Sequence, residues 1–145
     1  MVGPGGTSVK AALAFVLLAG CFWRSYGRAV ATHVEVLLGM ARKGVDLVAN
    51  ARLTAESMPE LTYPLERAQA FAETARARAA GRPPGSLLAF EALLVRYRSF
   101  LDALDRVRRQ QSGAAAGRTL QAPLAAVEAA GEAVRASLRS EGRIK

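Results

Sequence analysis

Residues 86–107 read SLLAFEALLVRYRSFLDALDRV, and this stretch decides the fold class. Its apolar side chains recur every three or four residues, which is the spacing of one face of an α-helix. Two acid-before-base pairs, Asp102–Arg106 and Asp105–Arg109, add support on the exposed face. At about 24 residues, the helix would be roughly 36 Å long. The members of the apolar stripe are Leu87, Phe90, Leu94, Tyr97, Leu101, Leu104 and Val107.

The same spacing recurs in three further segments of the chain. The first runs from about Ser25 to Ser57, the second from Ser57 to Ala79, and the last from Leu120 to Leu138. Short connections between amphipathic helices place each helix antiparallel to the next. The sequence therefore predicts an all-α fold, an antiparallel bundle of three to four long helices. The expected core residues are Val30, Val34, Leu37, Ala41, Val45, Val48 and Ala55, then Leu61, Leu65, Ala68, Ala72, Ala75 and Ala79, then Leu120, Leu124, Val127, Ala130, Val134 and Leu138.

Capping and breaking residues predict where these helices begin and end. Ser57, with Glu60 three residues later, forms a capping-box pattern, and Ser86 is placed to cap the helix that follows it. The Gly- and Pro-rich run 81–85 predicts a turn, whereas residues 110–118 predict a flexible connector.

The composition favours helices and argues against an enzyme. Apolar residues make up 51% of the chain but aromatic residues only 6%, so Ala, Leu and Val dominate the core. Ala and Leu are strong helix formers, whereas Gly39 and Gly44 in the first helix each cost about 1 kcal/mol. These glycines either permit close contact between helices or only weaken the middle of the helix, and the second interpretation is favoured. The single histidine, His33, and the single cysteine, Cys21, leave no pattern for a metal site, a disulfide or a hydrolytic centre. We therefore expect a non-enzymatic protein without a metal or a cofactor.

The first 23 residues carry the pattern of an export or anchor segment. Lys10 precedes the uncharged run 11–23, which is shorter than the roughly 20 residues that a membrane-spanning helix needs. Residues 18–21 read LAGC, the form of a bacterial lipobox, in which the cysteine receives lipid and becomes the first mature residue. Three interpretations stay open: a cleaved lipoprotein acylated at Cys21, an uncleaved anchor with aromatic residues 22–23 at the interface, or a helix buried in a cytosolic protein.

These patterns divide the chain into three parts. Residues 1–23 form the signal or anchor segment, residues 24–140 the helical bundle, and residues 141–145 a polar tail that we expect to fray. In the lipoprotein and the anchor interpretations, the bundle lies on the non-cytoplasmic side of a bacterial membrane, in the periplasm or its equivalent.

The net charge of +8 favours an anionic partner, either a lipid headgroup surface or nucleic acid. Arg24 and Arg28 follow the apolar run directly and are placed to contact headgroups. The alternative is an Arg-rich helical module that binds nucleic acid. It lacks a recognisable docking motif, and positive charge near a helix C-terminus explains Arg106, Arg108 and Arg109 more simply. The arginines concerned are Arg96, Arg98, Arg106, Arg108 and Arg109.

With these segments placed, residues 42–50, RKGVDLVAN, resemble the hallmark of LemA-family proteins, in which a basic pair precedes Asp-Leu-Ile/Val-Pro-Asn on a long first helix. Residues 26–30, YGRAV, are similar to the family's Tyr-Asn-x-Leu-Val stretch. Residues 75–79, ARARA, resemble its Ala-Arg-Ala stretch, and residues 96–101, RYRSFL, lie where the family has Glu-x-Tyr-Pro-x-Leu. Order and spacing agree over about residues 21–110, with Ala49 in place of the hallmark proline. The matching hallmark residues are Arg42, Lys43, Asp46, Leu47, Val48 and Asn50.

The resemblance implies a membrane-tethered bundle of long helices that faces away from the cytoplasm, with no enzymatic residues to transfer. One branch of the family is associated with magnetosome membranes. The resulting hypothesis is a membrane-anchored scaffold whose partners are membrane lipid and other envelope or membrane proteins, with self-association as a further alternative.

Overall fold

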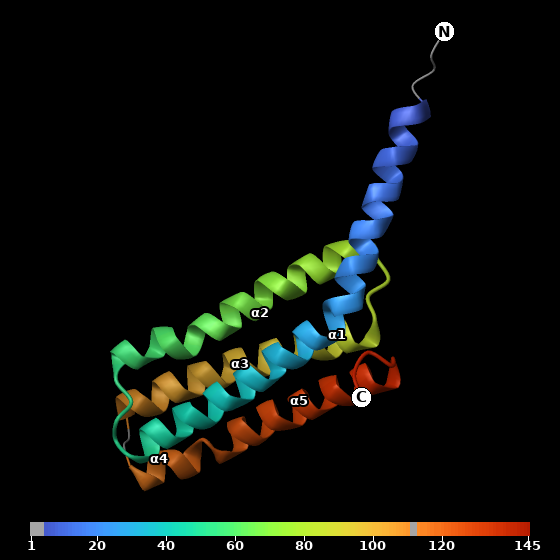
Figure 1. Cartoon of the computed structure of the whole chain (residues 1–145). Coiled ribbons are helices and arrows are strands. Elements are labelled where there is room, and N and C mark those ends of the chain that lie inside the picture. The colour runs from blue at the N-terminus through green and yellow to red at the C-terminus, as the bar shows by residue number, and fades with distance from the viewer. Residues whose placement is uncertain (1–4, 111–112) are drawn as a thin grey trace.

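The computed structural model describes residues 5–110 and 113–145, and for residues 5–9 and 11–19 it describes the backbone alone. Every regular element of the described part is a helix, so the predicted all-α bundle is confirmed at that level (Figure 1). The elements are α1 (Gly5–Ala49), the 3₁₀ turn η1 (Ala55–Ser57), α2 (Met58–Arg78), α3 (Gly85–Gln110), α4 (Ala114–Thr119) and α5 (Gln121–Ser140).

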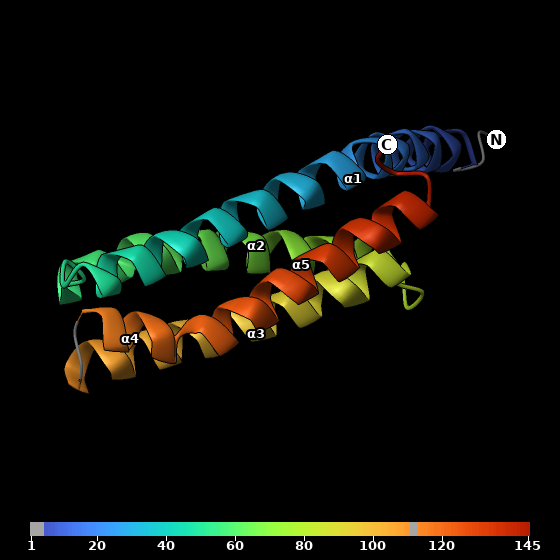
Figure 2. The same ribbon diagram turned by 90° about the horizontal axis from the view of Figure 1, so that it is seen from below.

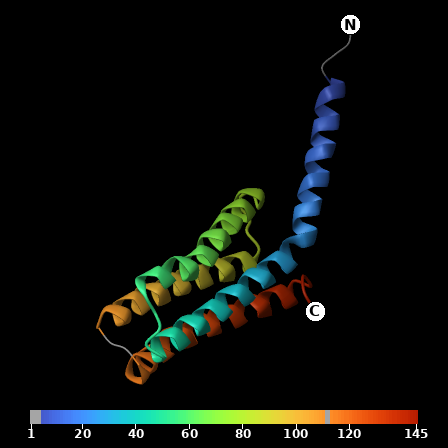
Figure 3. The same cartoon turned by 60° about the vertical axis from the view of Figure 1, so that its left-hand side comes forward.

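The helices α1, α2, α3 and α5 run antiparallel in chain order and form the bundle (Figures 1 and 2). Each packs against the next, α5 returns to pack against α1, and α1 also contacts α3 across the centre. Helices α2 and α5 occupy opposite corners without contact. The N-terminal part of α1 leaves the bundle and projects away from it, at the end where the α2–α3 turn and the C-terminus also lie (Figures 1 and 3).

The predicted apolar stripes form the core. All seven stripe residues of α3 are buried, and so are the first six of the α1 stripe and the first five of the α2 stripe. Tyr97 lies fully buried among them and donates a hydrogen bond of 2.6 Å to the carbonyl of Leu61. Because an unpaired buried hydroxyl is costly, this bond fixes the register of α3 against α2.

The first helix ends earlier than predicted. It stops at Ala49, because Asn50 and Ala51 turn the chain and Ala51 takes a positive φ of 54°. The amide of Arg52 then donates back to the carbonyl of Leu47 at 2.7 Å. Ala55, expected in the core, is therefore exposed.

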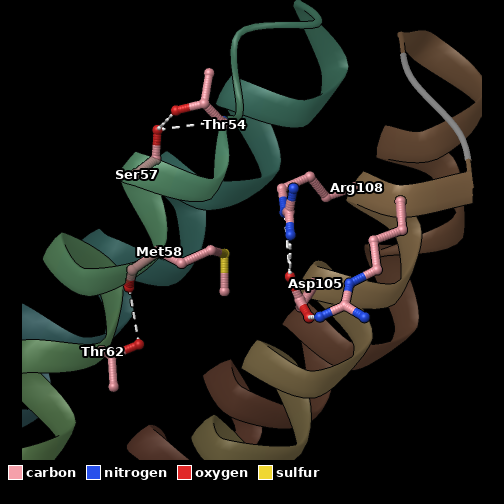
Figure 4. Close-up of polar contacts among 7 residues, drawn as sticks. Thr54, Ser57, Met58, Thr62, Asp105 and Arg108 are labelled. Atoms are coloured by element: carbon pink, nitrogen blue, oxygen red, sulfur yellow. Dashed lines mark hydrogen bonds and ion pairs between the residues drawn. The ribbon is translucent and has the colours of Figure 1, made fainter.

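The predicted capping box is shifted along the chain. Thr54, not Ser57, precedes the turn: its amide donates to Ser57 Oγ at 3.3 Å, and the two hydroxyls lie 3.1 Å apart (Figure 4). Glu60 instead forms an ion pair with Lys43 of α1.

The predicted connector 110–118 is also corrected in part. Residues 111–112 lie outside the described residues, but α4 occupies most of the remainder and docks on the end of α1. Gly117 is buried there, and a Cβ atom at this position would lie 3.0 Å from the Cβ of Ala49. Close contact between small residues therefore allows the short helix to pack.

Gly44 has the first of the two roles considered for these glycines, close contact between helices. A Cβ atom on Gly44 would lie 3.0 Å from Leu104 Cδ2, so this glycine admits the side chains of α3 rather than merely weakening α1. Gly39 faces open space and fits the original expectation.

Candidate functional site

The residues predicted to meet a membrane lie where α1 leaves the bundle. Cys21, Arg24 and Arg28 are exposed there, whereas Tyr26 is fully buried. Phe22 and Trp23 are half-buried and pack against the core, so the bundle extends slightly beyond the predicted boundary at residue 24. The side chains of residues 11–19, on which the anchor prediction rests, lie outside the described residues. No helix in the part searched is both long and apolar enough to cross a membrane.

An aromatic cluster anchors this exit point. The ring of Phe22 stacks on Phe71 of α2 at 5.8 Å between centroids, and Trp23 lies 4.9 Å from Tyr26. Two guanidinium groups cover the cluster. Arg78 at the end of α2 lies 4.8 Å from the centroid of Phe22, and Arg143 lies 5.4 Å from Trp23 and 4.9 Å from Tyr26. Such cation–π contacts are worth about 0.5–2 kcal/mol each.

The C-terminal tail is docked on this cluster, contrary to the prediction that residues 141–145 fray. The carboxylate of Glu141 accepts a 3.0 Å hydrogen bond from the amide of Ser86 and a 2.9 Å bond from Nε of Arg143. Tyr26 Oη and Ser86 Oγ share a further hydrogen bond of 3.0 Å. The predicted cap at Ser86 is thus wrong: Ser86 is buried, and Glu141 supplies the acceptor at the start of α3.

The tail also needs a glycine beneath it. A Cβ atom on Gly27 would lie 2.7 Å from both the Cβ and the carbonyl oxygen of Arg143. Gly27 therefore lets residue 143 cross directly over α1.

The electrostatics of the tail follow from this docking. Burial opposes ionisation of Glu141, but the hydrogen bonds from Ser86 and the guanidinium of Arg143 outweigh it and lower the pKa of the carboxyl. Burial raises the pKa of Tyr26, so its hydroxyl stays protonated and available to Ser86.

Basic residues surround the exit of α1, and we call this set the collar: Arg24, Arg28, Arg78, Arg82, Arg143 and Lys145. On one side of the tail, Trp23 and three of the collar arginines line a hollow of about 330 Å³. On the other side, Arg28 and Lys145 line a second hollow of about 530 Å³ together with Glu35. Only Arg24 and Arg28 could be assigned to this site from the sequence, because long-range packing brings the other four members of the collar to α1.

The LemA-like residues lie toward the opposite end of the bundle, and two of them, Arg42 and Lys43, connect α1 to neighbouring helices. Arg42 pairs with Glu128 of α5 at 3.4 Å, and Lys43 pairs with Glu60 of α2 at 2.5 Å. Val48 is buried, and Leu47 is half-buried. Asn50 donates a 2.8 Å hydrogen bond to the carbonyl of Asp46 and so covers the end of α1.

The arginines of α3 do not form one patch. Arg108 and Arg109 both pair with Asp105 at 2.8 Å, and the bond from Arg108 lowers the pKa of that carboxyl (Figure 4). The predicted Asp105–Arg109 pair is thus confirmed, whereas no Asp102–Arg106 pair occurs among the described ion pairs. Arg96 and Arg98 point about 160° apart around the helix, because two residues of about 100° each turn the helix by about 200°.

The remaining titratable candidate, His33, is a packing residue. It is half-buried and lies 5.2 Å from Phe71 and 6.0 Å from Phe90, and burial together with Arg67 lowers its pKa. In the described part of the chain, no three acidic, histidine or cysteine side chains gather as metal ligands would.

Comparison with protein-family models, with curated proteins and with solved structures gives no significant match. The LemA-like resemblance therefore stays a prediction.

Proposed function

We propose that this chain is a non-enzymatic helical scaffold held at a bacterial envelope membrane by its N-terminal segment, with the bundle on the non-cytoplasmic side. The observation that supports this proposal is the course of α1. One helix carries the apolar run away from the other helices, and Cys21 is exposed where packing begins (Figure 3).

The short distance between the attachment point and the bundle favours a membrane-proximal position. Cys21 precedes the fully buried Tyr26 by five residues, a rise of about 8 Å along a helix. A lipid on Cys21, or a helix inserted up to that point, would bring the collar to the headgroup layer. Aromatic and basic side chains are the types that suit this layer.

The contacts of the bundle suit a scaffold. Arg42, Lys43 and Arg76 each pair with a carboxylate on a neighbouring helix, the last through two hydrogen bonds of 2.7 and 3.0 Å to Glu91. These pairs are partly exposed and each contributes little stability, so the shared apolar core is what favours a rigid body that presents its surface to other envelope proteins. The nucleic-acid alternative ranks second, because Arg108 and Arg109 share Asp105.

The test is cell fractionation followed by the intact mass of the membrane-bound chain. A lipoprotein would begin at an acylated Cys21, whereas an uncleaved anchor would keep residues 1–20. A Cys21→Ser variant separates the two, because it abolishes acylation and processing but leaves an uncleaved anchor unchanged. Recovery of the wild-type chain only in the cytosolic fraction would contradict the proposal.

A further inference from the structure

We infer that the hollow lined by Trp23, Arg78, Arg82 and Arg143 binds the phosphate of an anionic phospholipid headgroup. This inference rests on the proposed membrane tether and adds to it a specific site. The hollow measures about 330 Å³, at the low end of the range of about 300–1,000 Å³ for small-molecule pockets. Its walls come from four places in the chain: α1, the end of α2, the α2–α3 turn and the docked tail.

The lining is strongly electropositive. It contains three guanidinium groups and no carboxylate, the other members being Trp23, Ala79 and Pro84. Arg78 and Arg82 form no ion pair within the described part of the chain. Arg143 uses only Nε for Glu141, which leaves its two terminal amino groups for another acceptor.

The guanidinium groups are held in place before any ligand arrives. The faces of Phe22 and of Trp23 fix Arg78 and Arg143, so little side-chain freedom remains to be lost on binding. Arginine forks match the geometry of phosphate oxygens. Stacking on an aromatic ring gives Arg78 and Arg143 a structural role that needs no ligand. It does not explain Arg82, which stacks on no aromatic ring within the described part of the chain.

The position of the hollow identifies the source of the phosphate. Trp23 lies two residues after Cys21, a rise of about 3 Å along α1. A phosphate bound so close to the attachment point would belong to a lipid headgroup of the membrane to which α1 is tethered. Arg24 and Arg28 are exposed on the same stretch of α1 and add to the attraction.

The test uses the full chain with vesicles of phosphatidylcholine alone and with vesicles containing phosphatidylglycerol. Trp23 is the only tryptophan of the chain, so its fluorescence reports on the hollow directly. We expect tighter binding to the anionic vesicles, with a Trp23 spectral shift. Arg78→Gln/Arg82→Gln should weaken this anionic binding by about fivefold for each arginine removed.

The matched control is Arg106→Gln/Arg118→Gln, which removes the same charge from exposed residues at the far end of the bundle. Helix α3, with 26 residues, separates the ends by about 39 Å, several Debye lengths at 0.1 M salt. Binding of this variant should change by less than about twofold. Equal losses in both double variants would show general charge attraction and overturn the inference.

Two further measurements distinguish a headgroup site from the membrane tether and from a site for free phosphate. The Arg82 side chain makes no hydrogen bond, ion pair or ring contact among the described residues, so Arg82→Gln alone should leave the fold intact. This single variant must also weaken anionic binding, and a loss of folding then cannot account for the result. Inorganic phosphate that gives the full Trp23 response, without preference for anionic vesicles, would overturn the assignment to a headgroup.

Equal binding of wild type and variants to both vesicle types would overturn the site and leave the tether intact, whereas failure of the tether would appear as a cytosolic protein in fractionation.

Discussion

Glu141 joins three segments that are distant in sequence. Its carboxylate accepts hydrogen bonds from the amide of Ser86, at the start of α3, and from Nε of Arg143. The guanidinium group of Arg143 in turn covers the rings of Trp23 and Tyr26 in α1. A charged acceptor at a helix N-terminus is favourable because the first amides have no partner within the helix. One carboxylate therefore caps α3 and holds the tail on α1.

We predict that Glu141→Gln lowers the free energy of unfolding by about 1 kcal/mol at pH 7, because the charged cap is lost. The folded pKa of Glu141 is lowered from the ordinary value of 4.5, so its stabilising contribution is present above pH 4.5 and is lost as the pH falls through the folded pKa. The gap between wild type and variant should thus shrink below pH 4.5. Urea denaturation at pH 7 and pH 3 measures it, with Glu73→Gln, an exposed residue, as the control. A gap of the same size at both pH values would contradict this account.

At the scale of elements, two of the glycines of α1 differ in what surrounds them. Gly27 lies beneath the tail, where a Cβ atom would overlap Arg143 at 2.7 Å. Gly39 faces open space. The same substitution at the two sites therefore separates helix propensity from packing between elements.

We predict that Gly39→Ala raises the free energy of unfolding by up to about 1 kcal/mol, because alanine is the better helix former. Gly27→Ala gains the same propensity but must displace the tail, at a cost of typically about 1–3 kcal/mol. The two variants should therefore differ by about 1–3 kcal/mol, measured by urea denaturation. Equal stabilisation in both would show that the tail does not rest on Gly27.

The helices themselves could be predicted from the sequence because their information is local. The stripe from Leu87 to Val107 has a helical period, and every member of it is buried. The end of α1 could not be predicted, since the positive φ of Ala51 has no marker such as glycine. The collar depends on Arg82 and Arg143 reaching Trp23 through folding, and no spacing along the chain records such a contact.

At the scale of the molecule, the described packing begins at Phe22, and the preceding part of α1 projects away from the bundle (Figure 1). We predict that deletion of residues 1–20 leaves the free energy of unfolding unchanged within about 0.5 kcal/mol, as for other changes away from packed features. Deletion through residue 26 should cost several kcal/mol, because it also removes the fully buried Tyr26. Thermal unfolding followed by helical circular dichroism compares the two. A large loss from the shorter deletion would mean that the projecting segment packs on the bundle.

The unbroken course of α1 from Cys21 into the core has a mechanical consequence. Residues 26–49 span about 36 Å at 1.5 Å per residue, and they belong to the same continuous helix as the point of attachment, which bends where it enters the bundle (Figures 1 and 3). The bundle therefore turns together with the attached end of this helix. A tilt of about 10° at the attached end would swing the α1–α2 turn sideways by roughly 6 Å, so a partner bound at the far end would sense the angle at which the helix is held.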